Sequence, residues 1–385
     1  MIIAAASVPD RLDRWPLLAL AAFVAAVQFS IAVSQILLAL TVFLWLARLH
    51  LRRERPAAPP FFTPLAVYAG LTLVSCAFSS DPVASLRDSR QLLLFLVVPV
   101  TYAFATRDRA PLLITTLITA GAISATIGVV QYALLQYDTL GRRPDGALSH
   151  YMTYAGTLML VLTAVVARLV FAPRGRAWAA VVMPALVGAL VLTFTRNAWV
   201  GALAGIALLL LLRDFRLIGI VPILVALVFA LAPPRITTRM MSMFDLQDPS
   251  NRDRVAMARM AGAIVRDHPL TGAGPNMIPR IYDRYRSPDP VNVRNPHLHN
   301  VPLQIAAERG LPALAAWLAF IAACTAGLVR LARRPDVRPL AATGLGALAA
   351  MLSAGLFEYN FGDSEVLMLF LFLITLPFAA ARERT

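Results

Sequence analysis

Two histidines near residue 300 are the side chains of this sequence best suited to proton transfer. Residues 295–300 read Asn-Pro-His-Leu-His-Asn and stand directly before a long apolar run. Histidine is the usual general base near neutral pH, so His299 is a candidate base and His297 a candidate substrate ligand. Two histidines one residue apart could instead bind a metal. No cysteine and few acidic residues lie nearby to complete such a site, so we expect no metal here.

Asn300 and Glu308 belong to the helix that this apolar run predicts. Asn300 can cap the helix, and the proline two residues later fits its first turn. Glu308 then lies about two turns inside the helix. An ionisable group within an apolar span is a candidate for function, although pairing with the neighbouring Arg309 is the structural alternative. We take Asn300 and Glu308 as candidate substrate ligands.

A single arginine, Arg196, stands between two apolar runs. The turn that contains it, at residues 195–201, reads Thr-Arg-Asn-Ala-Trp-Val-Gly. Arginine recognises phosphate oxygens with two parallel hydrogen bonds, so Arg196 is a candidate ligand of an anionic reaction centre. A lone arginine in so short a turn could also simply extend its charged end to a membrane surface.

Arg254 lies in a predicted amphipathic helix over residues 251–267, which Ser250 would cap. Three other arginines recur every seven residues and form a polar stripe: Arg252, Arg259 and Arg266. Arg254 lies off that stripe and shares a predicted face with three apolar residues: Ala258, Ala261 and Val265. A charge on an apolar face needs a partner, because an unpaired buried charge is costly. The partner is either an internal carboxylate or a bound anion.

Other candidates are weaker. Arg142 and Arg143 stand side by side in a loop and could contribute to substrate binding. Cys76 and Cys324 both lie inside apolar segments, as small core residues do. The sequence has no P-loop, no Rossmann glycine pattern and no nucleophile elbow. Nothing therefore indicates a soluble nucleotide-sugar donor.

The elements that must position these residues are membrane helices. Hydrophobic residues make up 59% of the 385 residues and charged residues only 15%, against about 25% charged in a soluble domain. About 20 apolar residues cross the bilayer core as a helix. We expect an all-α fold with one membrane domain over residues 1–385, the first span remaining as an anchor, and about twelve spans: 16–28, 31–47, 61–79, 92–105, 112–135, 151–171, 178–194, 198–212, 217–231, 301–329, 340–357 and 366–380.

The arginines predict the orientation of these spans. All 35 basic residues are arginine, for a net charge of +14. With the N-terminus in the cytoplasm, the cytoplasmic segments hold 19 arginines against 7 acidic residues, and the opposite face holds 16 against 14. This bias follows the positive-inside rule. The basic charge is therefore mostly a topology signal, and we expect membrane lipids and no nucleic acid as partners.

One long segment, residues 232–300, lies between the ninth and tenth predicted spans on the outer face. The other outer loops are short. A loop of this length in a compact membrane protein is usually functional. We therefore expect a single large periplasmic loop that carries Arg254 and the two histidines.

Three stretches together resemble the O-antigen ligase and polymerase superfamily of bacterial membrane glycosyltransferases. Residues 195–201 look like the family's Ser-Arg-x-x-Trp-x-Gly turn. Residues 254–274 look like its Arg-helix-His-Pro-x-x-Gly-x-Gly segment, with Ala258 where an aromatic residue is frequent. His299-Asn300, followed after nine residues by Gly310, matches the ligases' His-Asn-x9-Gly pattern.

The resemblance implies a GT-C-like fold and a reaction. The donor would be an O-antigen chain linked to undecaprenyl diphosphate, and the acceptor a sugar hydroxyl of lipid A–core. Arg196 and Arg254 would neutralise the leaving diphosphate, and His299 would accept the proton of the hydroxyl. The reaction would invert the anomeric centre, need no cofactor, and take place at the periplasmic face of the bacterial inner membrane.

Two other functions stay open at this point. A polysaccharide polymerase of the same superfamily would share the donor and use another lipid-linked glycan as acceptor. A lipid-linked sugar flippase or transporter belongs to a different class. A transporter should show repeated halves and spans broken near the midplane. The sequence shows neither, and its polar candidates gather on one face.

Overall fold

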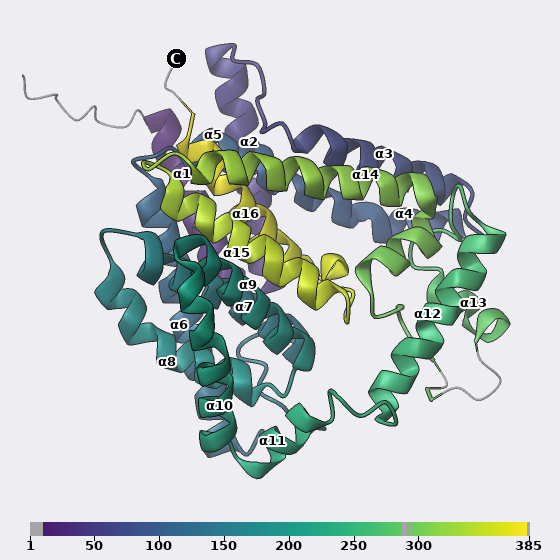
Figure 1. The fold of residues 1–385 in the computed structure, drawn as a ribbon. Coiled ribbons are helices and arrows are strands. Elements are labelled where there is room, and N and C mark those ends of the chain that lie inside the picture. The colour runs from purple at the N-terminus through teal and green to yellow at the C-terminus, as the bar shows by residue number, and fades with distance from the viewer. Residues whose placement is uncertain (1–10, 287–290, 293, 383–385) are drawn as a thin grey trace, which may run out of the picture.

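The computed structural model describes residues 11–286, 291–292 and 294–382, and these ranges contain helices but no strand. Figure 1 shows the helices in chain order, and their bounds are as follows: α1 (Arg11–Ala26), α2 (Ile31–Arg52), α3 (Phe62–Ala77), α4 (Pro82–Asp88), η1 (Ser89–Leu96), α5 (Val97–Phe104), α6 (Ala110–Leu135), α7 (Tyr151–Phe171), α8 (Arg176–Leu192), α9 (Arg196–Arg213), η2 (Phe215–Gly219), α10 (Ile220–Leu231), α11 (Pro234–Met241), α12 (Pro249–Asp267), α13 (Ile278–Tyr285), α14 (Val301–Ala332), α15 (Arg338–Gly355), η3 (Asn360–Gly362) and α16 (Ser364–Ala380).

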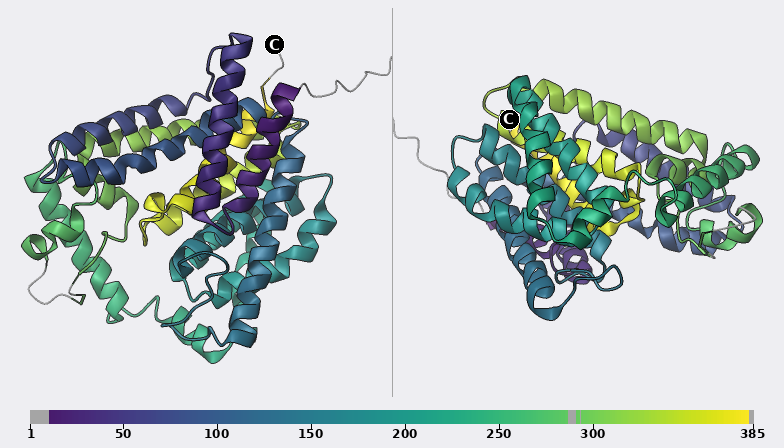
Figure 2. Two further views of the ribbon diagram at one scale, coloured as in Figure 1. Left: turned by 180° about the vertical axis from the view of Figure 1, so that it is seen from behind. Right: turned by 60° about the horizontal axis from the view of Figure 1, so that its bottom comes forward.

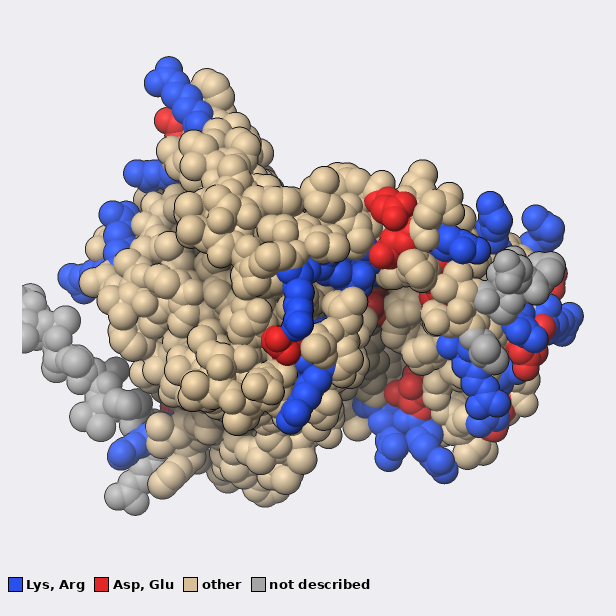
Figure 3. Space-filling view, turned by 90° about the horizontal axis from the view of Figure 1, so that it is seen from below, with Lys and Arg blue, Asp and Glu red and all other residues tan. Residues whose placement is uncertain are grey.

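The all-α prediction is confirmed, and the helices have the character of membrane spans. Among the described residues, five helices are long and apolar enough to cross a bilayer: α2, α6, α7, α9 and α14. Shorter apolar helices accompany them, among them α3, α8 and α16. Figure 3 shows a wide uncharged area over the bundle, with charged side chains gathered beyond it around a hollow.

The fourth predicted span, residues 92–105, is not one α-helix. The chain there forms the end of the 3-10 helix η1 and then α5, and the short α4 precedes both. Pro99 lies in the first turn of α5. Proline lacks an N–H and its ring excludes the carbonyl four residues earlier, so it fits a first turn and not a helix interior. The helix therefore restarts at this point.

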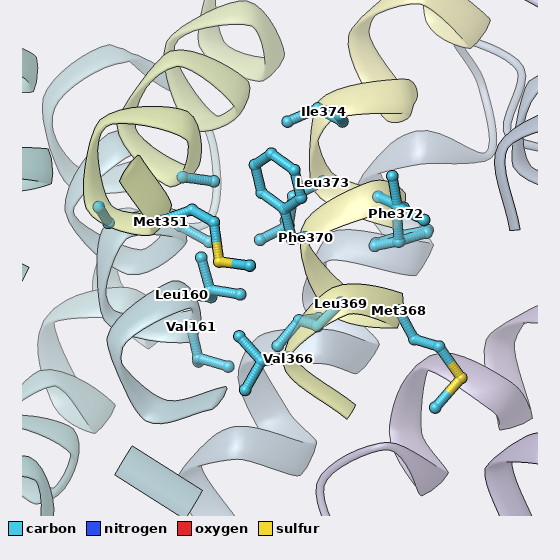
Figure 4. Packing of buried hydrophobic residues seen from close by; sticks show 14 of the residues in the cluster. Leu160, Val161, Met351, Val366, Met368, Leu369, Phe370, Phe372, Leu373 and Ile374 are labelled. Carbon is cyan, nitrogen blue, oxygen red and sulfur yellow. The ribbon is translucent and has the colours of Figure 1, made fainter. Parts of the chain in front are cut away.

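The core is built around α16. This helix is apolar on all sides, which is typical of a helix buried by its neighbours, and nearly all of its side chains are buried. It packs against α5, α7 and α15. Figure 4 shows Phe370 and Val366 of α16 facing Leu160 of α7 and Met351 of α15. The ends of α15 and α16 that meet at η3 are thus held rigidly.

The described part of residues 232–300 contains α11, α12 and α13, which lie on the far side of the bundle from α1 and the end of α16 (Figures 1 and 2). We call this side the loop side. Helix α12 packs against α14, whose N-terminal end also lies there. The segment that carries the candidate residues is therefore packed against the N-terminal end of α14 and is not a free loop.

Candidate active site

His299 and Glu358 form a hydrogen-bonded pair on the loop side. Nδ1 of His299 lies 3.0 Å from Oε2 and 3.3 Å from Oε1 of Glu358. Glu358 follows α15 and His299 precedes α14, so two apolar helices present the pair. A carboxylate on Nδ1 holds the imidazole proton there and leaves Nε2 as the basic nitrogen.

Glu358 is buried, at 6% exposed, yet it is ionised. Burial opposes its charge, but the hydrogen bond and the charge of His299 outweigh burial and lower the pKa of Glu358 to about 2. The backbone N–H of Tyr359 also donates to its Oε1 at 2.9 Å. A fixed carboxylate of this kind orients a base and stabilises the imidazolium that forms when the base takes a proton.

His297 lies against the same carboxylate. Its Nε2 is 3.3 Å from Oε1 of Glu358, and its ring centre is 4.4 Å from that of His299. Burial lowers the pKa of His297 to about 4 despite the nearby carboxylate, so this imidazole is neutral near pH 7. His297 therefore packs beside the His299–Glu358 pair as a neutral ring.

These three side chains could also hold a metal ion. One ligand atom from each of His297, His299 and Glu358 lies within 4.8 Å of the others, and two imidazoles with a carboxylate are ligands that zinc accepts. Few acidic residues stand near the histidines in the sequence, too few to complete a metal site, and Glu358 beside them was not foreseen. Glu358 is 59 residues from His299 along the chain, and the packing of α15 against α14 brings it there.

The turn that carries His299 is held in an uncommon conformation. His299 has a φ of 51°, in the left-handed region, where a non-glycine residue stores of order 1–3 kcal/mol. As predicted, Asn300 caps α14, and its Oδ1 accepts from the N–H of Leu303 at 2.9 Å. Its Nδ2 donates to the carbonyl of Leu356 at 3.0 Å. Asn300 thus ties the turn to the segment that leads to Glu358.

A backbone clasp joins the end of α12 to a kink in α14. Gly310 has a φ of 83° and a ψ of 168°, so α14 is broken there. Three hydrogen bonds of 2.8–2.9 Å between residues 269–274 and residues 307–311 satisfy the backbone groups that the break frees. We call these two segments the clasp. It fixes α12 about three turns from His299.

Glycine is required at two positions of the clasp. Gly272 and Gly310 have φ values of 66° and 83°. A Cβ on Gly310 would lie 2.1 Å from the carbonyl oxygen of Leu270, and one on Gly272 would lie 2.3 Å from the carbonyl carbon of Glu308. The glycines of the His-Pro-x-x-Gly-x-Gly and His-Asn-x9-Gly patterns therefore let two backbones meet, and they contact no reactive group.

Helix α12 begins earlier than predicted and buries a different face. Asp248, and not Ser250, is its N-cap, because Pro249 occupies the first helical position, which suits a residue without an N–H. The buried face carries Asp253, Met257, Met260, Ala261 and Ile264. Ala258 is exposed, so the predicted apolar face of Arg254 was wrong. The spacing was ambiguous by one position, and packing on α14 decided it.

Asp253 and Arg254 have separate tasks although they are neighbours. Oδ1 of the buried Asp253 accepts from Nδ2 of Asn295 at 3.1 Å, which holds the histidine segment against α12. Nε of Arg254 donates to the carbonyl of Phe357 at 3.1 Å, one residue before Glu358. Burial, and then the charge of Arg196, lower the pKa of Arg254. Arg254 is therefore at the site, half-buried, and beside another cation.

Arg196 is buried at the start of α9 and hydrogen-bonds to the segment between α11 and α12. Its Nη1 donates to the carbonyl and hydroxyl oxygens of Ser242 at 3.0 and 2.8 Å, and its Nη2 donates to Oδ1 of Asp248 at 3.1 Å. Only 5% of Arg196 is exposed, so it does not extend to a membrane surface. It anchors residues 242–248 below α12.

Arg196 belongs to a group of four arginines, Arg143, Arg196, Arg239 and Arg254, which we call the arginine cluster. The four repel one another electrostatically. Burial, and then the other three arginines, lower the pKa of Arg239 to about 10. Among the described residues, Asp248 is the carboxylate that forms ion pairs with the cluster, with Arg196 at 3.1 Å and Arg239 at 3.7 Å. Positive charge at the cluster is therefore in excess, which favours the binding of an anion.

The remaining predicted ligands are placed differently. Arg143 stacks on Tyr151 with its guanidinium 4.2 Å from the ring centre and belongs to the cluster. Arg142 stacks on Tyr137 at 4.3 Å, apart from it. Glu308 is 1% exposed, and its Oε2 accepts from Nη1 of Arg309 at 3.1 Å. In this conformation Glu308 has the structural pairing, and its role as a substrate ligand stays a prediction.

A cavity of about 200 Å³ opens beside the His299–Glu358 pair. Its polar lining includes His150, Asn197, His297, Glu358 and Asp363. It provides space for a polar group next to His297 and Glu358, the neighbours of the candidate base.

Sequence reasoning missed Glu358 and Arg239. Glu358 is an acidic residue at the outer end of a predicted span, on the same face as His299, and that position was a usable signal. Arg239 had no such signal, because it is one of many arginines in residues 232–300. Only folding brings it to Asp248, the carboxylate that also pairs with Arg196.

Residues 178–318 match the sequence profile of a family described as O-antigen ligase. The matched segment runs from α8 into α14 and includes Arg196, Arg239, Arg254 and His299, whereas Glu358 lies beyond it. No curated protein matches the chain. By this match and its apolar helices, the chain is a membrane protein that carries a domain of the O-antigen ligase/polymerase superfamily.

Proposed function

We propose that this protein is an O-antigen ligase, which transfers O-antigen polysaccharide from undecaprenyl diphosphate to a sugar hydroxyl of lipid A–core. One observation carries the proposal. A histidine with Nδ1 held 3.0 Å from a buried carboxylate lies beside a cluster of arginines with excess positive charge. A base and an anion site in one place suit glycosyl transfer from a diphosphate.

The acceptor side of the reaction belongs to His299. The acceptor hydroxyl loses its proton to Nε2 of His299 while its oxygen forms a bond to the anomeric carbon. Glu358 stabilises the imidazolium that results. None of the described residues hydrogen-bonds to Nε2 of His299, so this nitrogen is available to the hydroxyl. The diphosphate oxygen leaves from the opposite face of the sugar, so the anomeric centre is inverted.

The donor side belongs to the arginine cluster. The bond between the anomeric carbon and the phosphate oxygen breaks, and the electron pair stays on the diphosphate. Arg254 and Arg196, with Arg239 and Arg143 around them, neutralise this charge as it develops. Preorganised cations of this kind take the part that a divalent ion plays elsewhere, so the reaction requires no metal. The remaining predicted substrate ligands, Arg142 and Glu308 among them, would act outside this step.

The same proposal includes the membrane topology. Twelve spans with the N-terminus in the cytoplasm place residues 232–300 in the periplasm of the bacterial inner membrane. The arginine bias of the short loops supports this orientation. Residues 334 and 250 should therefore report opposite sides of the membrane when fused to topology reporters.

Deletion of the gene tests the proposal. Loss of the O-antigen ladder on a lipopolysaccharide gel, with lipid-linked polymer retained, is expected of a ligase. A band with a single repeat would instead indicate a polymerase of the same superfamily, which remains the second candidate because it shares the donor and the superfamily. If the protein is a flippase or transporter, the purified protein will form no glycosidic bond between donor and acceptor.

A further inference from the structure

A groove of about 1020 Å³ runs between α2 and the α4–η1 segment. Helix α2 packs against α1 and α5, and only four of its side chains are buried. The left view of Figure 2 shows α2 and the neighbouring α3 diverging from one another. The bundle therefore leaves one side of α2 and of η1 uncovered, and the groove lies there.

One end of the groove is apolar. Helix α2 lines it with a stripe at helical spacing: Leu38, Ala39, Val42, Phe43 and Leu46. Three leucines of η1 form the opposite wall, at positions 93, 94 and 96. Phe43 is 66% exposed and Leu93 64%. Large apolar side chains left open on both walls are suited to hydrocarbon chains, which would bury them.

The other end of the groove is cationic. Arg87, Arg90 and Arg280 line it, and all three are exposed. The carboxylate of Asp88 also lines the groove, and it lies 4.0 Å from the guanidinium of the buried Arg309. Arg280 forms an ion pair with Asp81. No carboxylate among the described residues pairs with Arg87 or Arg90. Arg90 lies near the start of η1, and the three leucines lie toward its end. The cationic and apolar parts of the groove are therefore at its two ends.

The groove ends next to the candidate active site. Gly362 lines both the groove and the cavity that contains His297 and Glu358. Nε2 of Gln91, in the wall of the groove, donates to the carbonyl of Gly362 at 2.6 Å. Gly362 is the last residue of η3, so this turn borders both spaces. None of the four arginines of the cluster lines the groove.

We propose that this groove binds a phosphorylated lipid, with its chains along α2 and its phosphates on Arg87, Arg90 and Arg280. The identity of this lipid rests on the function proposed above: it is the acceptor, lipid A–core, which carries both phosphates and acyl chains. Donor and acceptor then reach His299 from two separate cationic sites. Separate sites allow both lipids to be bound at once, which a direct transfer between them requires.

Binding to the full-length protein in nanodiscs tests the groove. Two variants disrupt it: the double variant Arg87→Ala/Arg90→Ala removes cations, and Ala39→Trp fills the apolar end. Two matched controls lie outside it: Arg284→Ala on α13, near Arg280, and Ala32→Trp on α2. The probes are fluorescent lipid A–core and undecaprenyl diphosphate, and their dissociation constants are measured separately.

Each groove variant should raise the Kd for lipid A–core by roughly tenfold or more: the arginine double variant because it removes charged hydrogen bonds, and Ala39→Trp because its ring occupies the space of the acyl chains. The Kd for undecaprenyl diphosphate should stay as in the wild type, and both controls should bind both probes normally. Unchanged binding of lipid A–core, or a selective loss of undecaprenyl diphosphate, would overturn the assignment of the groove.

The groove and the proposed function fail in different ways. If lipid A–core binding depends on the groove but the wild-type protein transfers no glycan to it, the ligase proposal is wrong and the groove stands. If the wild-type protein transfers glycan and the groove variants bind lipid A–core normally, the groove assignment is wrong and the ligase proposal stands.

Discussion

Two groups of buried charge in this protein are built in opposite ways. Glu308 and Arg309 are neighbours within the clasp, at 1% and 5% exposed, and pair at 3.1 Å. In the arginine cluster, Asp248 forms ion pairs with two of the four cations, Arg196 and Arg239. The first group is balanced and closed, as structural ion pairs are. The second has positive charge in excess, which suits an anionic ligand that arrives from outside.

The comparison shows why a buried charge in a sequence is ambiguous. Glu308 looked like a substrate ligand because it stands inside an apolar helix. Arg196 looked similar in the sequence. Whether a charge is structural or functional depends on the balance of charge around it, and distant segments set that balance.

Gly310→Ala should have the largest effect and abolish the folded protein. A Cβ there would lie 2.1 Å from the carbonyl oxygen of Leu270, and the φ of 83° disfavours alanine. Size-exclusion chromatography in detergent measures the folded yield. Gly262→Ala is the matched control, since its Cβ would meet nothing within 4 Å. A normal yield for Gly310→Ala would show that the clasp does not hold α12 and α14 together.

Glu308→Ala should destabilise the protein by about 3 kcal/mol, because it leaves the buried Arg309 with the more distant carboxylate of Asp88, at 4.0 Å, as its remaining ion-pair partner. The free energy of unfolding in detergent micelles measures this effect. Glu308→Gln keeps the shape of the side chain and separates loss of charge from loss of packing. Near-normal stability of Glu308→Ala combined with lost transfer would assign Glu308 to the substrate.

Arg239→Ala should weaken donor binding by roughly 10–100-fold, as expected for loss of a charged hydrogen bond. It should change stability little, because Arg239 adds to repulsion in the cluster. Arg235→Ala on the same helix is the control, since Arg235 is exposed and pairs with Asp138. Equal effects of the two variants on the Kd for undecaprenyl diphosphate would remove Arg239 from the donor site.

Excess EDTA should have the smallest effect, with transfer by the purified enzyme unchanged. In this account, arginines neutralise the diphosphate and Glu358 orients His299, so no step needs a divalent ion. The group of His297, His299 and Glu358 makes this a demanding test. Loss of transfer that a single kind of divalent ion restores would contradict this account and would assign His297, His299 and Glu358 to a metal site.

The sequence was sufficient for the helical class, for most helix bounds and for the residues of the short motifs. Apolar runs and positions such as the Asn300 cap depend on local chemistry, and local chemistry is visible in a sequence. Asp248 displaced Ser250 as the cap of α12 because the proline that follows it fits the first helical position. That signal was present and misread by two residues.

The partners of the motif residues were not predictable in this way. Glu358 reaches His299 across 59 residues because α15 packs on α14. The buried face of α12 was assigned wrongly because the alternatives differ by about one residue of rotation. Packing between distant helices decides such cases, and one sequence holds no direct record of it.

The most direct test of the central claim measures donor affinity and transfer rate together in His299→Ala and Arg254→Ala. Both variants should be purified in folded form, with Arg284→Ala as control. His299→Ala should lose roughly 10²–10⁴-fold in transfer to lipid A–core and keep its affinity for a lipid diphosphate. Arg254→Ala should lose both, and Arg254→Lys should recover little, because an ammonium cannot form the two-pronged contact. Near-normal transfer by both variants, or loss of donor binding by His299→Ala alone, would contradict the account.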